Sequence, residues 1–340
     1  MQVWLWLPVV TALSYLLTWG VRRYALARSL MDVPNARSSH SVPTPRGGGV
    51  AIVVSFLVAL LLLAGSGQIE SNFVWAMGGA GAGIAVLGFL DDHGHIAARW
   101  RLLGHFAAAI WALAWLGGLP PVPLFGTVVD LGVVGHVLAV FYLVWLLNLY
   151  NFMDGIDGIA SVQAVCTCLG GALLYGIVGL PGTAQATVLL GAAALGFLIW
   201  NFPPARIFMG DAGSGFLGVA LGMLTLQAAW ASPQLLWAWI ILLGVFIVDA
   251  TYTLIRRLLR GDKVYEAHRS HAYQFASRKY GRHLPVTLSV LVINLAWLLP
   301  WSVCVALGWI DGLVAVIVAY VPLVWLAVRF NAGALETADR

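Results

Sequence analysis

Apolar runs long enough to cross a membrane recur along the whole of this sequence. A transmembrane helix needs about 20 apolar residues, and eleven stretches approach this length: residues 3–21, 47–65, 72–90, 103–119, 132–149, 161–180, 185–202, 214–231, 235–255, 286–307 and 312–329. Hydrophobic residues make up 61% of the 340 and charged residues only 9%, so polar groups cannot cover a water-soluble surface. The sequence therefore predicts an all-α polytopic membrane protein, a bundle of ten or eleven transmembrane helices.

The first apolar run is expected to remain in the protein as a helix. A secretory signal peptide carries its positive charge ahead of the apolar region, whereas Arg22 and Arg23 follow it here. The sequence contains no repeat of fixed period, no low-complexity linker and no sizeable soluble segment. We therefore expect residues 1–340 to form a single integral membrane domain.

The basic residues determine the expected orientation. If the N-terminus lies outside, all 18 Lys and Arg residues fall in segments on the inner side, and the only charged residues opposite are the acids Glu70, Asp130 and Asp311. An excess of Lys and Arg marks cytoplasmic segments. The net charge of +4 thus reflects topology and contact with membrane lipid, because no basic module interleaved with aromatic residues indicates a nucleic acid partner.

The unusual polar clusters all fall on this same inner side. They are "DVPNARSSHSVPTPRGGG" (32–49), "DDHGHIAARWR" (91–101), "YNFMDGIDGIA" (150–160), "NFPPARIFMGDAGSG" (201–215) and "YEAHRSHAYQ" (265–274). The outer connections "SGQIES" and "LPPVPLFGTVVDLG" lack His and Arg. Polar loop residues of no special role would be found on both faces, so the asymmetry predicts one active-site cleft on the cytoplasmic face.

The clusters combine acidic, amide and basic side chains. The oxygen-bearing set suits a hard cation such as Mg²⁺, which takes one or two carboxylates and keeps positions for phosphates; it comprises Asp91, Asp92, Asp154, Asp157, Asp211, Asn148, Asn151 and Asn201. Positive charge for phosphate oxygens comes from Arg37, Arg46, Arg101, Arg269, His268 and His271. Three glycine-bearing loops, "RGGG", "DGIDG" and "MGDAGSG", allow close backbone approach to a diphosphate. Together they indicate phosphoryl transfer.

Four of these segments, in this order and spacing, resemble the polyprenyl-phosphate N-acetylhexosamine-1-phosphate transferase superfamily (glycosyltransferase family 4). They are "DDHGH…RWRLLGH", "NLYNFMDGIDG", "NFPPARIFMGDAGS" and the last loop with its histidines, and the segment from Asp32 also fits. The superfamily includes the phospho-MurNAc-pentapeptide translocase and the bacterial enzymes that initiate O-antigen synthesis. The resemblance implies transfer of a sugar-1-phosphate from a UDP-sugar to undecaprenyl phosphate at the bacterial inner membrane, with release of UMP and a requirement for Mg²⁺.

The resemblance also implies roles for individual residues. Asp211 would be the principal metal ligand and Asn151 the second, and Phe208 would lie against uracil. Asp91 and Asp92 would activate the lipid phosphate or position the metal. The full catalytic set we expect is Asp91, Asp92, Asp154, Asp157, His268 and His271. The substrate-binding set we expect, besides Phe208, is Arg46, Arg101, Asn148, Asn201 and Arg269.

Two departures from the family's pattern bear on the substrate. The first motif often reads Asp-Asp-x-x-Asp and here ends in His95, and the last loop reads "HRSHAYQ" instead of a tight run of histidines. That loop resembles the branch that initiates O-antigens with N-acetylated 6-deoxyhexosamines, such as N-acetylfucosamine or N-acetylquinovosamine. N-Acetylglucosamine stays the alternative donor sugar. Mn²⁺ as the metal and a homodimeric state also stay open.

Two other classes of protein fit the clusters less well. A transporter would place its ionisable groups near the membrane midplane, and an intramembrane aspartyl protease would need a glycine where Phe208 stands. Single residues also have plainer roles, such as His93, His95 and His105 as interfacial polar groups. The intramembrane acid Asp249 is either a functional group or a partner of Arg256 or Arg257.

Overall fold

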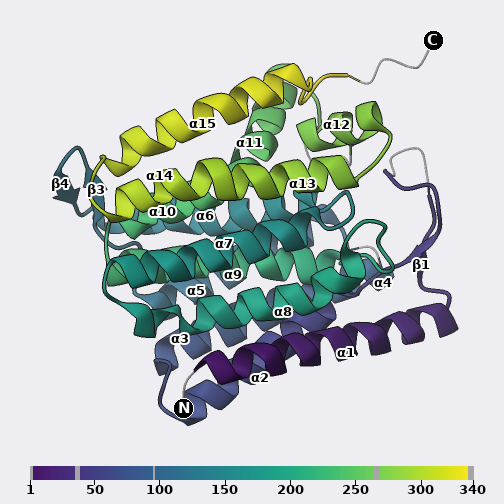
Figure 1. The fold of residues 1–340 in the computed structure, drawn as a ribbon, viewed down its shortest axis with the longest axis horizontal. Coiled ribbons are helices and arrows are strands. Elements are labelled where there is room, and N and C mark those ends of the chain that lie inside the picture. The colour runs from purple at the N-terminus through teal and green to yellow at the C-terminus, as the bar shows by residue number, and fades with distance from the viewer. Residues whose placement is uncertain (1–2, 35–38, 95, 264–267, 336–340) are drawn as a thin grey trace.

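The computed structural model describes residues 3–34, 39–94, 96–263 and 268–335, so Arg37 and His95 lie outside the described residues. The described chain is almost entirely helical, and its helices run side by side along one direction (Figure 1). The expectation of an all-α polytopic membrane protein is confirmed.

Each of the eleven apolar runs contains helix. In chain order the helices are η1 (Val3–Leu5), α1 (Trp6–Ala27), α2 (Val50–Gly65), α3 (Ser71–Ala76), η2 (Met77–Gly81), α4 (Ala82–Gly94), α5 (Ala98–Leu116), α6 (Gly132–Met153), α7 (Ile159–Ile177), η3 (Pro181–Ala184), α8 (Gln185–Asn201), α9 (Asp211–Ala231), α10 (Leu235–Leu242), α11 (Gly244–Leu259), α12 (Ala272–Tyr280), α13 (Leu284–Ile293), η4 (Asn294–Leu298), α14 (Leu299–Ala306) and α15 (Gly312–Arg329). The short α12 lies in the basic segment between two of these runs and was not expected from hydropathy.

Fewer helices meet the criteria for a membrane span than the sequence suggested. Within the described ranges, seven segments are long and apolar enough to cross a membrane, and the pair α10 and α11, bent by 71°, would make an eighth. The helix α2 has only 16 residues. The helices α1 and α5 are long enough but less apolar, because each carries two arginines near one end.

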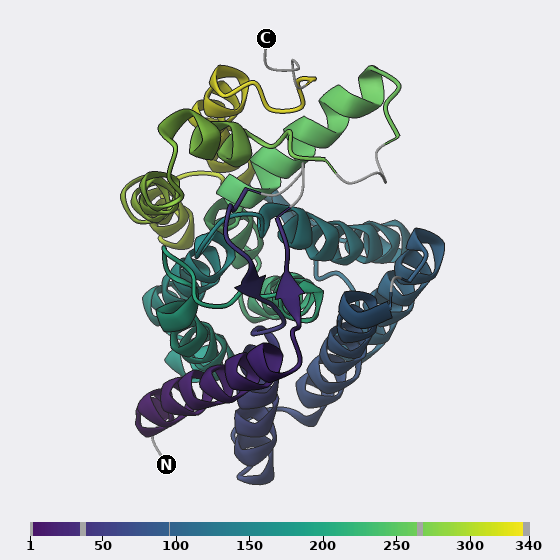
Figure 2. The same ribbon diagram turned by 90° about the vertical axis from the view of Figure 1, so that its right-hand side faces the viewer.

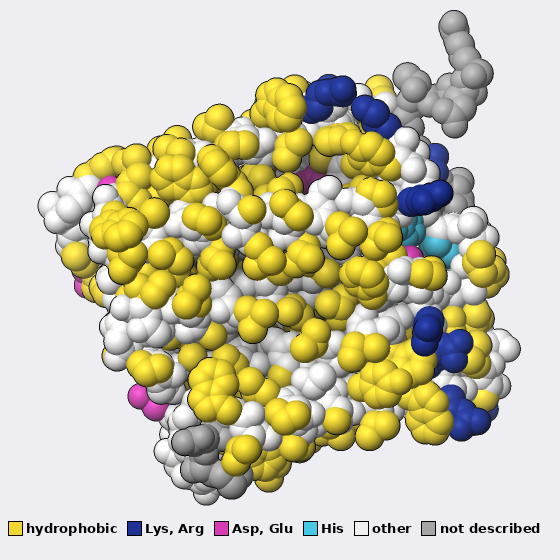
Figure 3. All heavy atoms as spheres, viewed as in Figure 1, with side chains coloured by type: hydrophobic (Ala, Val, Ile, Leu, Met, Phe, Trp, Pro, Cys, Tyr) yellow, Lys and Arg dark blue, Asp and Glu magenta, His cyan; other side chains and the backbone are white. Residues whose placement is uncertain are grey.

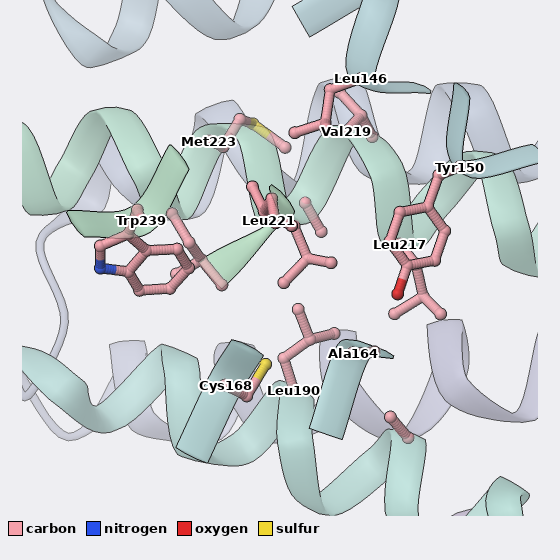
Figure 4. Close-up of a cluster of buried hydrophobic side chains, with 14 of the residues drawn as sticks. Leu146, Tyr150, Ala164, Cys168, Leu190, Leu217, Val219, Leu221, Met223 and Trp239 are labelled. Carbon is pink, nitrogen blue, oxygen red and sulfur yellow. The ribbon is translucent and has the colours of Figure 1, made fainter. Parts of the chain in front are cut away.

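The helix α9 forms the centre of the bundle. Seventeen of its 21 residues are buried, and Figure 2, which looks along the helices, shows the other helices arranged around it. Gly218 and Gly222 let α6 approach, since a Cβ at Gly218 would lie 2.7 Å from the Cα of Leu147. Glycines four residues apart commonly allow such close contact between membrane helices. Figure 4 shows the apolar side chains of this core, including Leu146, Leu217 and Trp239.

The two ends of the bundle differ in charge. Two small antiparallel hairpins mark them: β1 (Met31–Asp32) with β2 (Thr44–Pro45) at one end, and β3 (Val122–Leu124) with β4 (Thr127–Val129) at the other. Lys, Arg and His side chains gather at the first end, acidic side chains appear at the other, and an apolar surface lies between them (Figure 3). This separation matches the charge bias read from the sequence.

Candidate active site

The N-terminal polar segment and the loop before α9 are joined by backbone hydrogen bonds. The Phe208 N–H donates to the Pro45 carbonyl at 2.8 Å, and the N–H groups of Gly48 and Gly49 donate to the carbonyls of Phe208 (2.9 Å) and Met209 (2.8 Å). Only glycine fits at position 49, because a Cβ there would lie 2.4 Å from the Cα of Gly213. Two segments more than 150 residues apart in the sequence therefore form one surface at the basic end, where β1 and β2 cross in front of α9 (Figure 2).

Asp211 is the first residue of α9 and the point where three motifs meet. Its Oδ1 accepts a hydrogen bond from Nδ2 of Asn151 on α6 at 2.9 Å. Its Oδ2 lies 3.8 Å from Nη1 of Arg101 on α5. The helix α4 also reaches this point, since a Cβ at Gly88 would lie 2.6 Å from the Asp211 carbonyl carbon. The glycine thus allows α4 to bring its own acids to Asp211.

The paired acids at the end of α4 have different partners. Asp91 accepts hydrogen bonds from the Ile96 N–H at 2.7 Å and from the guanidinium of Arg101. Asp92 accepts the Asp211 N–H through Oδ2 at 3.0 Å. Arg46 lies beside Asp92, with Nη1 3.9 Å from Oδ1, and donates to the Asp92 backbone carbonyl. The two neighbouring carboxylates therefore lie on either side of Asp211, each with its own arginine.

Two cavities share Asp211 and Asn151 as a common wall. The larger, of about 280 Å³, is lined by Asp32, Ser39, His40, Arg46, Asp92, Asn151, Asp154, Gly155, Ile156, Asp157, Asn201, Phe208, Met209, Gly210, Asp211, Ser214, Gln274 and His283. The smaller, of about 50 Å³, includes Asp91, Arg101, His105 and Asn148 in its lining. Asn148 also donates to the Val144 carbonyl at 2.7 Å. Most of the expected site residues thus lie around one pair of cavities, which we call the large and the small pocket.

Asp154 lines the large pocket, and among the residues that the structure describes no group donates a hydrogen bond to its carboxylate. Burial and the neighbouring carboxylates of Asp211, Asp92 and Asp157 raise the pKa of Asp154 well above its ordinary value. A carboxyl that is costly to ionise is common where a protein binds a cation or transfers a proton. Asp154 is therefore suited to receive a cation or a proton in this pocket.

Asp157 and Asn201 line the same pocket, but their polar side-chain atoms form hydrogen bonds with other groups of the protein. Asp157 accepts the Ala205 N–H at 3.0 Å, and its other oxygen lies 3.0 Å from Nδ1 of His283. The buried Asn201 accepts from the Gly158 N–H at 3.1 Å and donates to the Ile207 carbonyl at 3.0 Å. In this structure both residues hold the loops of the pocket in place.

Phe208 lies beside a residue that the sequence did not single out. The ring centroids of Phe208 and His40 are 4.8 Å apart, with an edge-on angle of 65°. Both residues line the large pocket and also an adjoining cavity of about 460 Å³. An aromatic ring at the edge of a pocket is a common platform for a planar base.

The expected set His268, Arg269 and His271 lies outside the lining of the large and small pockets, around the start of α12. His271 is 2% exposed and its Nδ1 lies 3.3 Å from Oδ1 of Asp249. Burial, with smaller effects from the charges of His271 and Arg257, lowers the pKa of His268 to about 3, so this ring is neutral at pH 7. The backbone carbonyl of Arg269 accepts a hydrogen bond from the guanidinium of Arg278. The helix nevertheless reaches the large pocket through Gln274.

Asp249 has a different partner from the one suggested by its spacing. It lies on α11 and accepts the N–H groups of Ala272 at 2.9 Å and Tyr273 at 3.0 Å, besides contacting His271. Its expected pairing with Arg256 or Arg257 is therefore wrong. The start of α12 offers unpaired N–H groups that attract a carboxylate, and the fold brings Asp249 there.

His283 is the main residue of the pocket that sequence reasoning missed. It stands just before an apolar run, in a segment rich in basic residues, and nothing local distinguishes it from a membrane-interface residue. Its partners Asp157 and Ser39 are 126 and 244 residues away in the sequence. Only the packing of α13 beside the loop after α6 reveals it.

The donor set of the large pocket fits a hard cation completed by a substrate. Among the described residues, no group of three His, Cys, Asp or Glu side chains is close enough to hold a metal ion alone. However, Asp92, Asp154 and Asp211 all line the large pocket, and Arg46 is the only Lys or Arg in the described part of its lining. This excess of acidic over basic side chains suits Mg²⁺, which needs only one or two carboxylates when phosphates and water complete its shell.

Residues 74–229 match the sequence profile of glycosyl transferase family 4. The chain is 32% identical to the probable undecaprenyl-phosphate N-acetylglucosaminyl 1-phosphate transferase of Bacillus subtilis, over 81% of this chain and 76% of the relative. It is 28% identical to the decaprenyl-phosphate N-acetylglucosaminephosphotransferase of Mycolicibacterium smegmatis, over 92% and 86%. It is 29% identical to the phospho-N-acetylmuramoyl-pentapeptide-transferase of Thermodesulfovibrio yellowstonii, over 70% and 73%.

Proposed function

The chain belongs to the polyprenyl-phosphate N-acetylhexosamine-1-phosphate transferase superfamily, and from this premise we propose that it transfers an N-acetylhexosamine-1-phosphate from a UDP-sugar to undecaprenyl phosphate, releasing UMP. The observation that carries the proposal is the meeting of Asp92, Asp154 and Asp211 in one pocket at the basic end of a membrane bundle. We place this end at the cytoplasmic face of the bacterial inner membrane, since basic segments favour that side.

In the proposed reaction an oxygen of the acceptor phosphate attacks the β-phosphorus of the UDP-sugar. A new P–O bond forms there, the bond between the β-phosphorus and the bridging oxygen breaks, and that oxygen leaves with UMP. The protein has to align the two phosphates and offset their charge. Arg101 and Arg46, on the two sides of Asp211, are placed to contact phosphate oxygens. We assign direct attack in preference to a covalent phosphoaspartate.

Asp91 and Asp92 would accept a proton from the acceptor phosphate or orient it. Both carboxylates are held in place by backbone N–H groups, those of Ile96 and Asp211, so their positions do not depend on substrate. Such fixed acids and bases contribute roughly 10²–10⁴-fold to a rate. Phe208, whose ring forms a T-shaped pair with that of His40, would form the wall for the uracil ring.

Asp211 and Asn151 would hold Mg²⁺, with Asp154 facing the same pocket. Bound there, the ion would neutralise charge on the diphosphate. Asn151 presents its NH₂ group to Asp211 here, and a half-turn of the amide would present its oxygen instead.

The donor sugar has two candidates. The last loop, "HRSHAYQ", resembles the branch that uses N-acetylated 6-deoxyhexosamines, and initiation of O-antigen synthesis would follow from that reading. The names of the Bacillus and Mycolicibacterium relatives favour N-acetylglucosamine. A panel of radiolabelled UDP-sugars with undecaprenyl phosphate in detergent tests both. Label from at least one UDP-N-acetylhexosamine should enter the lipid product, and its absence with every donor would refute the proposed function.

A further inference from the structure

His283 joins three polar segments around the large pocket. It is the residue before α13, and its Nδ1 lies 3.0 Å from Oδ1 of Asp157 in the loop after α6. Its Nε2 lies 2.8 Å from the backbone carbonyl oxygen of Ser39 in the N-terminal segment. The two ring nitrogens therefore face two acceptors on different parts of the chain.

These contacts determine the protonation state of the ring. A carbonyl oxygen can only accept, so Nε2 must carry a hydrogen. If Nδ1 were bare, it could accept the Asp157 N–H at 3.3 Å, but its lone pair would face a carboxylate oxygen 3.0 Å away. An imidazolium removes this repulsion because it donates from both nitrogens. Burial lowers the pKa of His283, but the hydrogen bond and charge of Asp157 and the Ser39 carbonyl raise it more, so the pKa lies above its ordinary value.

The groups joined by His283 form the walls of the pocket. The second oxygen of Asp157 accepts the Ala205 N–H at 3.0 Å, in the loop that leads to Phe208. Ser39 precedes His40, whose ring packs against that of Phe208 in a T-shaped arrangement. One positive charge thus links the DGIDG loop and the Ser39–His40 segment, and each of these contacts the loop before α9.

We propose that His283, as an imidazolium, is a positioning residue for the nucleoside diphosphate sugar. It holds Ser39, His40 and Asp157 in the geometry that receives this donor. The inference rests on the proposed function. His283 need not touch the reacting phosphates, so its loss should weaken donor binding more than it slows the reaction of bound donor.

Other titratable and charged groups lie near His283, and their titration must be distinguished from that of its ring. Asp157, from the loop after α6, is the direct partner of His283, and Asp154 lies in the same pocket wall. His40 belongs to the N-terminal segment, and Arg282 is the chain neighbour of His283. His40 bonds the Asp32 carbonyl rather than an acid. Removing His283 alone distinguishes its titration from theirs.

The test is the pH dependence of KM for the UDP-sugar and of kcat, from about pH 6 to about pH 9. Since the contact requires a charged ring, the donor KM of the wild-type enzyme should be constant at low pH and rise about tenfold as His283 loses its proton, the effect expected for one charge-assisted hydrogen bond. His283→Gln should show the raised KM at every pH, without that transition, and with kcat little changed. His283→Arg, which keeps a charged donor, should restore a low KM that no longer varies with pH.

His136→Gln is the matched control, because His136 also holds a backbone N–H, that of Leu119, but near the hairpin of β3 and β4 at the opposite end. Its KM and pH profile should equal those of the wild-type protein. A wild-type KM or an unchanged pH transition in His283→Gln would overturn the proposal.

Hydrogen–deuterium exchange needs no substrate and separates this inference from the proposed function. Exchange of the backbone around residues 39–49 should be faster in His283→Gln than in the wild-type protein at the same pH. If exchange is unchanged, the positioning role is wrong, whatever the substrate. If exchange increases but no UDP-sugar is turned over by the wild-type enzyme, the proposed function fails and the contact itself stands. If His283→Gln does not fold, the wild-type pH profile and His283→Arg still decide.

Discussion

The side chain of Asp92 caps the central helix of the bundle by accepting the backbone N–H of Asp211, 3.0 Å away and 119 residues later in the chain. The residue before α9, Gly210, has no side chain to serve as a cap, and helix N-termini need such acceptors. Asp92 therefore fixes the start of α9 relative to α4 while its carboxylate lines the large pocket.

Asp92→Asn removes the charge and keeps the cap, because an amide oxygen can still accept the Asp211 N–H. If the carboxylate assists the acceptor phosphate, kcat should fall by roughly 10²–10⁴ while UDP-sugar binding changes little. Asp91→Asn should behave in the same way. Steady-state kinetics and titration calorimetry measure the two effects, and unchanged turnover in both variants would exclude the assigned role.

Asp154→Asn should stabilise the protein while it inactivates it. A raised carboxyl pKa means that stability is lost as the pH rises from about 3.9, the value in an unfolded chain, through the folded pKa. The uncharged amide avoids this loss at neutral pH, so the free energy of unfolding should rise by roughly 0.5–2 kcal/mol, the usual gain from a single stabilising substitution. Thermal unfolding without divalent metal at pH 7 should give a higher Tm for the variant, and at low pH the difference should vanish. A lower Tm at pH 7 would contradict the account of this residue.

Asp211→Asn should abolish transfer, beyond the roughly 10²–10³-fold loss on removing one preorganised electrostatic contact. It should also raise the Mg²⁺ concentration needed for UDP-sugar binding, because the ion would link the protein to phosphate oxygens. The control is Asp130→Asn, since Asp130 accepts the Gly132 N–H at the opposite end of the bundle. Titration calorimetry with and without Mg²⁺ gives the result, and wild-type metal dependence in Asp211→Asn would move the ligand assignment to another residue.

Topology can be tested with single cysteines at the two ends. Ser41 is exposed beside the large pocket, and Ser71 is exposed at the start of α3 at the opposite end. With the basic end in the cytoplasm, a membrane-impermeant thiol reagent should label Ser71→Cys but not Ser41→Cys in spheroplasts, and both after lysis. Of the native cysteines, Cys166 and Cys168 are buried and should add little background, and the half-buried Cys304 is replaced by Ser in both variants. Labelling of Ser41→Cys in sealed spheroplasts would reverse the topology.

The class of fold and the location of the site follow from local properties of the sequence. Apolar runs and the one-sided placement of Lys and Arg are enough to predict helices and a single polar end. The side chains of Asp91, Asp92, Asn151, Asp154 and Asp211 converge on the two pockets because each lies at or near a helix end on that side. The number of spans was less predictable, because α2 is short and α10 and α11 are bent.

The functions of single polar residues inside the site depended on distant partners. Nothing in "NFPPARIF" indicates that the side-chain amide of Asn201 forms hydrogen bonds with the backbone of Gly158 and Ile207. Nor does the spacing of Asp249 from Arg256 reveal the start of α12, which offers better donors. These hydrogen bonds join residues 43, 6 and 23 positions apart, and they are determined by how the helices and the connecting loops pack, which the local composition does not encode.

The most direct test of the account follows the β-phosphate of the donor. With undecaprenyl phosphate and a UDP-N-acetylhexosamine radiolabelled in its β-phosphate, the enzyme should move the label into the lipid and release unlabelled UMP, one for each lipid formed. Label found in released UDP, with an unlabelled glycolipid, would show transfer of the sugar alone and would contradict phosphoryl transfer in the pocket of Asp92, Asp154 and Asp211.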